Sequence, residues 1–282
     1  MLLLAISLAL AIIPMSADYD AQKPIGVFDS GLGGLSVLRE IYRQFPDERL
    51  IYVADSAHAP YGTKTADFIT WRCEQIVAFL EEQQCKAVVV ACNSATAICI
   101  EHLRANSNLP IIGIEPAIKP AAASSHSRRI GLLATQATLN SKRLMTLQQS
   151  WAQQCEVICV PCPGFVECVE RGDISGPHVR ALASPILEHL TQMGVDTLIL
   201  GCTHYPFLLP LFNKLVKNEM RIIDPAPAVA KQLGLRLSQQ GLLARGNNTE
   251  VIGFYSSAPE LINQQIIQQL WGTSLRIQSL PA

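Results

Sequence analysis

The sequence has few charged residues and almost no net charge. Only 16% of its 282 residues are charged, and 22 Lys and Arg residues stand against 23 Asp and Glu residues. A chain without a basic surplus has no net field that would attract nucleic acid or an anionic membrane. Hydrophobic residues make up 49%, which argues against disorder. We therefore expect a globular protein that acts on a small molecule, with neither nucleic acid nor a membrane as its partner.

The nine cysteines lack the pattern of a disulfide framework or of a zinc site. Their number is odd and their spacing irregular, in a chain long enough to fold without cross-links. One CxxC pair occurs, at Cys159 and Cys162, but a zinc site needs a second pair or two suitably spaced histidines. The sequence therefore predicts no metal and a reducing compartment, the cytoplasm. Most of the cysteines should be small buried apolar side chains.

No Lys or Arg precedes the apolar run at the N-terminus. Residues 1–14 read MLLLAISLALAIIP, which is too short to span a bilayer but within the range of a signal-peptide core. The nearest small-residue site, at positions 15–17, matches a cleavage site poorly. We treat residues 1–20 as an apolar extension, with export and a true start at Met15 as open alternatives.

From residue 25 onward, short β-branched runs alternate with amphipathic stretches of helical length. This alternation is typical of βαβ units and a mainly parallel sheet. The predicted strands cover residues 25–28, 50–54, 87–91, 111–114, 130–134, 157–160, 197–200, 222–224 and 251–255. Two predicted helical stripes consist of Val37, Leu38, Ile41, Tyr42 and Phe45, and of Ile69, Ile76, Phe79 and Leu80.

A weak internal repeat indicates two similar halves. Residues 88–94 read VVVACNS and residues 198–204 read LILGCTH, so Cys92 and Cys202 each end a buried strand, at an offset of 110. Gly26 and Gly131 stand at a similar offset of 105. The sequence predicts an α/β fold of two pseudo-symmetric open domains with mainly parallel sheets facing a shared cleft. We assign residues 21–117 plus 226–282 to the first domain and residues 118–225 to the second.

Cys92 and Cys202 are the candidate reactive groups. Ligands of open parallel sheets lie beyond the carboxyl ends of the strands, so two facing halves would bring both cysteines to one cleft. Each cysteine precedes polar residues where a helix should begin. The N–H groups of a helix N-terminus stabilise a thiolate, so we expect both thiols to be more acidic than free cysteine, whose pKa is about 8.5.

Asp29 ends the first predicted strand and begins a glycine-rich turn at residues 31–34. A dinucleotide-binding motif would need a glycine where Ser36 stands, so NAD binding is not expected. The glycines allow an anion to approach the backbone N–H groups closely. Read alone, Asp29 and Ser30 could equally serve only to cap the next helix.

Two further groups could hold a charged substrate. Tyr61 and Gly62 lie in a loop close to Asp55, from which a hydroxyl and backbone amides could reach a carboxylate, although an ordinary turn reads the same way. His204, two residues after Cys202, could polarise that thiol or hold a charged substrate group.

Four motifs in register resemble the glutamate racemases of the aspartate/glutamate racemase superfamily. They are Asp29-Ser30-Gly31, Pro60-Tyr61-Gly62, Cys92-Asn93-Ser94-Ala95 and Gly201-Cys202-Thr203-His204-Tyr205-Pro206. The resemblance implies interconversion of L- and D-glutamate without pyridoxal phosphate, another cofactor or a metal. It also implies supply of D-glutamate for peptidoglycan, and hence for the cell wall and cell shape, and a possible homodimer.

The resemblance also assigns residue roles. Cys92 and Cys202 would be the catalytic acid/bases, with Asp29, His204 and Glu170 as auxiliary catalytic groups. Glu170 matches less directly, because Glu167 takes the family's usual proline position. The substrate-binding residues would be Asp29, Ser30, Tyr61, Gly62, Asn93, Ser94, Thr203 and His204. Ser94 stands where the family commonly has Thr, which keeps the hydroxyl.

Two other functions stay open at this point. A racemase of aspartate or a related α-substituted acid would share the fold and the cysteine pair, and would differ only in its contacts to the substrate side chain. A two-lobed small-molecule binding protein would fit the α/β halves and the apolar N-terminus. Turnover separates the second alternative from the racemases, and the relative rates on glutamate and aspartate separate the first.

Overall fold

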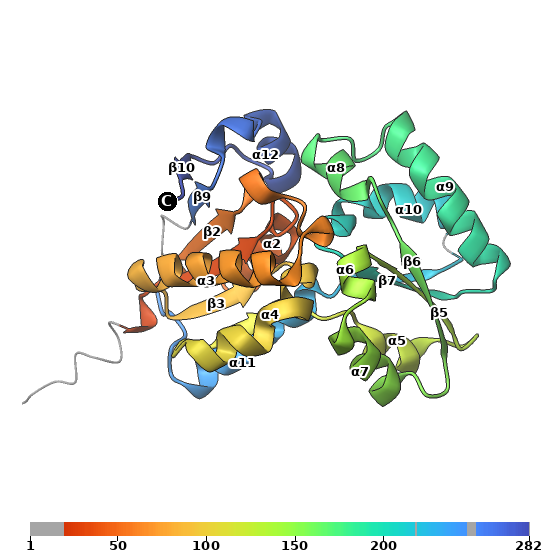
Figure 1. Cartoon of the computed structure of the whole chain (residues 1–282), viewed down its shortest axis with the longest axis horizontal. Coiled ribbons are helices and arrows are strands. Elements are labelled where there is room, and N and C mark those ends of the chain that lie inside the picture. Colours follow the sequence, from red (N-terminus) through yellow and green to blue (C-terminus); the bar gives the residue numbers. More distant parts are fainter. Residues whose placement is uncertain (1–19, 218, 247–251, 282) are drawn as a thin grey trace, which may run out of the picture.

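The computed structural model describes residues 20–217, 219–246 and 252–281, so nearly all of the predicted apolar extension and position 251 lie outside it. The described strands form two parallel sheets, one in each half of the molecule (Figure 1). The first sheet has the order β10-β9-β2-β1-β3-β4 and the second the order β6-β5-β7-β8. The prediction of an α/β fold with mainly parallel sheets is therefore confirmed.

The first sheet contains β1 (Ile25–Asp29), β2 (Leu50–Ala54), β3 (Ala87–Val90), β4 (Ile111–Gly113), β9 (Ile252–Ser256) and β10 (Ile277–Ser279). It packs with α2 (Leu35–Gln44), α3 (Ala66–Glu82), α4 (Asn93–Asn106), α11 (Ala226–Gln239) and α12 (Gln264–Trp271). Short 3₁₀ turns follow β2, at η1 (Ser56–His58) and η2 (Tyr61–Thr63), and β9, at η4 (Pro259–Leu261).

The second sheet contains β5 (Arg129–Ala134), β6 (Glu156–Pro161), β7 (Thr197–Gly201) and β8 (Arg221–Ile223). Its helices are α5 (Ile118–Ser124), α6 (Gln136–Leu139), α7 (Lys142–Trp151), α8 (Phe165–Glu170), α9 (Pro177–Gln192) and α10 (Leu209–Val216). A 3₁₀ turn, η3 (Tyr205–Leu208), precedes α10. The chain passes between the halves after β4 and again before α11 (Figure 1).

The strand registers reproduce the internal repeat. The order β2-β1-β3-β4 corresponds to β6-β5-β7-β8, with β1 and β5 in equivalent central places. Gly26 of β1 pairs with Val88 of β3, and Gly131 of β5 pairs with Leu198 of β7. Each catalytic candidate lies four residues beyond its paired position, at the carboxyl end of an equivalent strand. The exact domain boundaries stay a prediction.

Burial explains which sequence patterns were informative. Every residue of β1, β2, β3 and β7 is buried, as expected for parallel strands covered on both faces. The stripe on α3 is buried throughout, but Tyr42 of the stripe on α2 is 41% exposed. Tyr42 lies within α2, as the stripe predicted, and its ring packs on Trp271 of α12, with ring centroids 5.8 Å apart.

Strand β10 was not predicted from the sequence. It is only three residues long, with two of them exposed, so no apolar run marks it. None of the helices in the described ranges is both long and apolar enough to cross a lipid bilayer.

A buried ion pair joins β3 to the segments beside it. Nζ of Lys86 lies 2.5 Å from Oε2 of Glu48, and the two side chains are 1% and 2% exposed. Lys86 also donates to the carbonyls of Ala21 and Leu242, and Glu48 accepts from the N–H of Ala244. The pair therefore ties together four segments that are distant in sequence.

We expect Lys86→Met to lower the free energy of unfolding by about 3 to 5 kcal/mol, because it leaves Glu48 as an unpaired buried charge. Urea denaturation followed by circular dichroism measures the change. Arg43→Met is the matched control: it removes an ion pair with Glu40 on the surface of α2, which should be worth no more than about 1 kcal/mol. Equal losses of unfolding free energy in the two variants would contradict the stabilising role of the buried Lys86–Glu48 pair.

Candidate active site

The two cysteines lie at the carboxyl ends of equivalent strands, as predicted. Cys92 follows β3 and caps α4, where its Sγ accepts from the N–H of Ala95 at 3.5 Å. Cys202 follows β7, but the next element is the 3₁₀ turn η3, so the predicted α-helix does not begin there. Both side chains are buried, at 5% and 7% exposure.

One small cavity brings both thiols together. Its volume is about 10 Å³, close to that of a single water, so the enclosing segments must move apart to admit an amino acid. It is lined by Ser30, Pro60, Tyr61, Gly62, Cys92, Asn93, Ser94, Thr135, Val166, Cys202, Thr203 and His204. Of the residues expected at the site, only Asp29 and Glu170 do not line it, and both contact residues that do.

Asp29 is a fully buried carboxyl that links the two halves. Its Oδ1 accepts from the hydroxyl of Thr203 at 3.1 Å, and its Oδ2 accepts from the N–H of Gly31 at 3.1 Å. Burial raises the pKa of Asp29 above its usual value, although the charge of His204 opposes this. A carboxyl that holds its proton more strongly than usual is better matched to exchange protons with a thiol.

The acidity expected for Cys92 is wrong for this structure. Burial raises the pKa of the Cys92 thiol well above its ordinary value, and the charge of Asp29 raises it further. The N–H of Ala95 and the Ser30 hydroxyl, 3.9 Å from Sγ, favour the thiolate but do not offset the burial. The helix N-terminus is present, as predicted, but desolvation outweighs it, so Cys92 rests as a thiol.

His204 and Glu170 form a pair beside Cys202. Nε2 of His204 lies 2.6 Å from Oε1 of Glu170, and its Nδ1 lies 3.7 Å from Sγ of Cys202. Burial alone would lower the pKa of His204, but its bonds to Cys202 and Glu170 raise it well above the ordinary value. A protonated imidazole in this place donates one N–H to Glu170 and presents the other to the sulfur.

Glu170 also binds the glycine-rich turn. Its Oε1 accepts from the N–H of Leu32 at 2.7 Å, and a Cβ atom at Gly31 would collide with this carboxylate. The turn therefore does bind an anion through its backbone, as its glycines indicated, and that anion is a side chain of the second half. At Gly33 a Cβ atom would likewise collide with the ring of His204.

Tyr61 contacts the cavity differently from the prediction. Its hydroxyl donates to Oδ2 of Asp55 at 2.5 Å and is not available to a substrate carboxylate. Burial raises the pKa of this hydroxyl, which stays protonated as a donor. The backbone of Tyr61 and Gly62 is what this loop can offer to a ligand.

Two polar residues at the cavity stand out in the structure. The side-chain oxygen and nitrogen of Asn93 are buried, and neither has a hydrogen-bond partner within the described residues. Thr135, which sequence reasoning missed, hydrogen-bonds Ser94 through the two hydroxyls at 2.9 Å. Thr135 is the counterpart of Ser30 in the repeat, at the same offset of 105 as Gly26 and Gly131, and that offset could have identified it.

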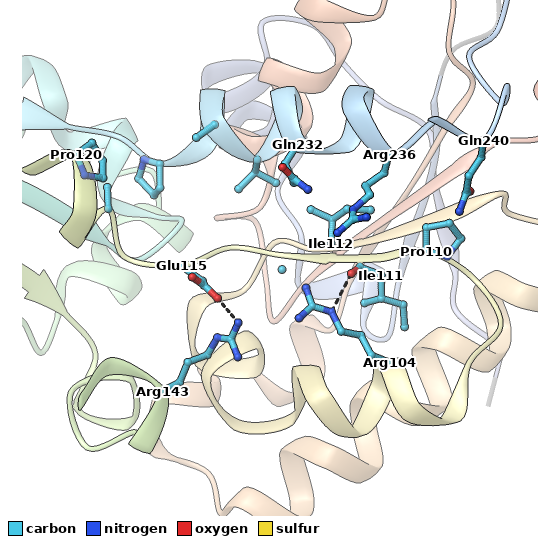
Figure 2. Close-up of a pocket in the computed structure, with 15 residues that line it drawn as sticks. Arg104, Pro110, Ile111, Ile112, Glu115, Pro120, Arg143, Gln232, Arg236 and Gln240 are labelled. Carbon is cyan, nitrogen blue, oxygen red and sulfur yellow. Dashed lines mark hydrogen bonds and ion pairs between the residues drawn. The ribbon is translucent and has the colours of Figure 1, made fainter. Parts of the chain in front are cut away.

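The described part of the chain also holds a larger cavity and no metal-binding cluster. No group of three His, Cys, Asp or Glu side chains in it is arranged to hold a metal ion. The larger cavity, of about 730 Å³, lies where the chain crosses between the halves, and Figure 2 shows Arg104 and Arg236 directed into it. Arg143 of α7 and Glu115 of the crossing segment also line it and pair with each other (Figure 2). Arg143 pairs with Glu101 of α4 as well. Neither cysteine of the small cavity lines this one.

The fold and the site together define a class: a two-lobed α/β protein with two thiols in one closed cavity, one beside a carboxyl and the other beside an imidazole. The chain belongs to the Asp/Glu/Hydantoin racemase family, whose profile matches residues 25–233. The resemblance seen in the motifs is thereby confirmed, as is the expectation of an enzyme of the racemase class.

Individual relatives are similar to this chain over most of its length. A glutamate racemase from Pseudomonas entomophila (strain L48) is 48% identical over 263 residues, which cover 93% of this chain and 99% of the relative. Among solved structures, the glutamate racemase RacE1 from Bacillus anthracis superposes with a TM-score of 0.81 at 30% identity, covering 93% of this chain and 98% of that one. A glutamate racemase from Francisella tularensis in complex with D-glutamate gives a TM-score of 0.80, with the same identity and coverage.

Proposed function

We propose that this protein interconverts L-glutamate and D-glutamate without a cofactor, by moving a proton between the substrate Cα and two cysteine thiols. The observation that carries the proposal is the meeting of Cys92 and Cys202 in one cavity, each from the equivalent strand of its half. Racemisation removes a proton from one face of Cα and returns one to the opposite face. Two opposed acid/bases accomplish this, whereas a single fixed base tends to restore the original enantiomer.

Each of the two thiols has its own neighbouring acid/base group. Asp29 is the acid/base group beside Cys92, and its charge raises the pKa of that thiol. His204 is the acid/base group beside Cys202, and Glu170 fixes its ring through Nε2. One thiolate removes the α-proton while the opposite thiol donates its own, and the roles reverse for the other enantiomer. Between turnovers, each auxiliary group returns its thiol to the protonation state that the next turnover requires.

The remaining polar residues of the cavity bind the amino acid. Asn93 brings an amide that has no hydrogen-bond partner among the residues the structure describes, and Ser30, Ser94 and Thr203 bring hydroxyls. The α-proton is a very weak acid beside a thiol, so the site must stabilise the developing carbanion by oriented donors in a dry cavity. The near-complete burial of the site supports such a role, and the names of the relatives support glutamate as the substrate.

Incubation of the purified protein with D-glutamate in D₂O, without added cofactor, tests the proposal. We expect optical rotation to disappear while deuterium enters at Cα, which polarimetry and proton NMR follow together. L-Aspartate in a parallel sample distinguishes the related racemase activity. Exchange on aspartate alone would reassign the substrate, and no exchange on either amino acid would favour a binding protein.

We further propose that the protein supplies D-glutamate for peptidoglycan, in the cytoplasm and as a homodimer, with domains at residues 21–117 plus 226–282 and 118–225. Nine free cysteines support a reducing compartment. Expression of this chain in a bacterium that requires added D-glutamate tests the first point, because the proposal predicts growth without that supplement. Light scattering of the purified protein tests the dimer, and a monomeric mass would exclude it.

A further inference from the structure

Asp55 is a fully buried carboxylate at the end of β2, beside the active site. Its backbone N–H donates to the carbonyl of Asp29 at 3.0 Å. Arg72 of α3 donates to its carboxylate through Nε at 3.0 Å and Nη2 at 2.8 Å, and the Tyr61 hydroxyl donates at 2.5 Å. Nδ1 of His58 lies 2.9 Å from the same group. Asp55 therefore ties the segment after β2 to helix α3.

The segment that Asp55 holds forms one wall of the active site. Residues 60–62 line the cavity together with Cys92. A Cβ atom at Gly62 would meet the Cβ of Thr135 at 3.0 Å, so this segment lies against the second half. A small displacement of residues 60–62 would thus change both the cavity wall and the contact between the halves.

The geometry of the Arg72 side chain suits it to fix this position. A guanidinium that bonds a carboxylate through two nitrogens sets its orientation as well as its charge. Burial alone would raise the pKa of Asp55, but hydrogen bonds from Arg72, Tyr61 and His58 lower it below the usual value. The carboxylate is therefore charged at neutral pH and keeps all of these partners.

We propose that Arg72 and Asp55 are positioning residues that hold residues 60–62 in their substrate-binding place and thereby set the affinity for the amino acid. The inference rests on the proposed function, because glutamate is its probe. Neither residue lines the cavity, so both act through the backbone of the segment between them. Contacts of this kind are made to the bound substrate and to the transition state alike, so their loss raises KM and leaves kcat nearly unchanged.

The test compares Arg72→Met with Arg72→Lys, which have similar lengths and differ in charge. We expect Arg72→Met to raise KM for both enantiomers about tenfold with kcat within about twofold, because it removes both hydrogen bonds from Arg72 to the Asp55 carboxylate. Arg72→Lys should restore most of the affinity. Glu74→Gln is the matched control, since it removes an exposed ion pair with His102 from the same helix and should leave KM unchanged.

Calorimetric titration with D-glutamate and thermal melting accompany the kinetics. A lower melting temperature with unchanged KM in Arg72→Met would show a purely structural role and overturn the inference, as would a fall in kcat alone. If Arg72→Met does not fold, Tyr61→Phe decides, because it removes only the hydroxyl bonded to Asp55 and must also raise KM. If the wild type binds glutamate without turning it over, the proposed function fails, and the titration of the same variants still tests the positioning.

Discussion

Cys92→Ala and Cys202→Ala should each abolish racemisation in both directions, with a loss of about 10³-fold or more. A positioned acid/base contributes about 10² to 10⁴ in rate, and here each thiol is needed once per turnover whichever enantiomer is consumed. The two variants should lose activity to similar extents, because removal of either thiol leaves one face of Cα without a proton donor or acceptor. Polarimetry, which follows the loss of optical rotation as one enantiomer is converted into the other, provides the rate.

Isotope exchange sharpens this prediction. With one thiol left, the α-proton of only one enantiomer faces a base, so slow deuterium entry without inversion should survive for that enantiomer alone. The two variants should retain exchange on opposite enantiomers. Cys85→Ala is the matched control, since Cys85 is also buried but lies away from the cavity, and its rate should stay near that of the wild type. Full racemase activity in either active-site variant would refute the two-thiol assignment.

The fold was predictable because its buried strands are short continuous apolar runs. Strands such as β3 and β7 are covered on both faces, and their sequences show it directly. The repeat added what single elements could not, because equal offsets between glycines and between cysteines reflect equal strand registers. Strand β10 escaped because three mostly exposed residues at a sheet edge leave no periodic pattern.

The candidate site was predictable as a set of positions but not as a set of hydrogen bonds. The motifs located the residues that line the cavity except Thr135 and Val166, since each motif follows a strand. The partners of those residues lie far away in sequence: Glu170 binds Leu32 across 138 positions, and Thr203 binds Asp29 across 174. The protonation of Cys92 depends on the same packing, because burial opposes the helix N-terminus by an amount that only the folded structure sets.

The second large effect concerns Asp29. We expect Asp29→Asn to lower kcat about 10²-fold, the lower range for loss of a positioned acid/base. The amide keeps the size of the carboxyl and can still accept one of the bonds from Gly31 and Thr203, but it cannot exchange a proton with Cys92. Removal of a nearby negative charge should also make Cys92 more acidic, so its alkylation by iodoacetamide should begin at lower pH than in the wild type.

The pH dependence of stability separates this catalytic effect from damage to the fold. Burial raises the pKa of Asp29 in the folded state, so the folded state favours the neutral carboxyl. This contribution to the free energy of unfolding is fully present below the pKa that Asp29 has in the unfolded state. That contribution is lost as the pH rises through the folded pKa, and the asparagine variant has no such loss. Urea denaturation should therefore find the variant's stability, relative to wild type, higher at pH 8 than at pH 4. A relative stability that falls over this range, or a kcat equal to that of the wild type, would contradict the role of Asp29 as a buried proton carrier.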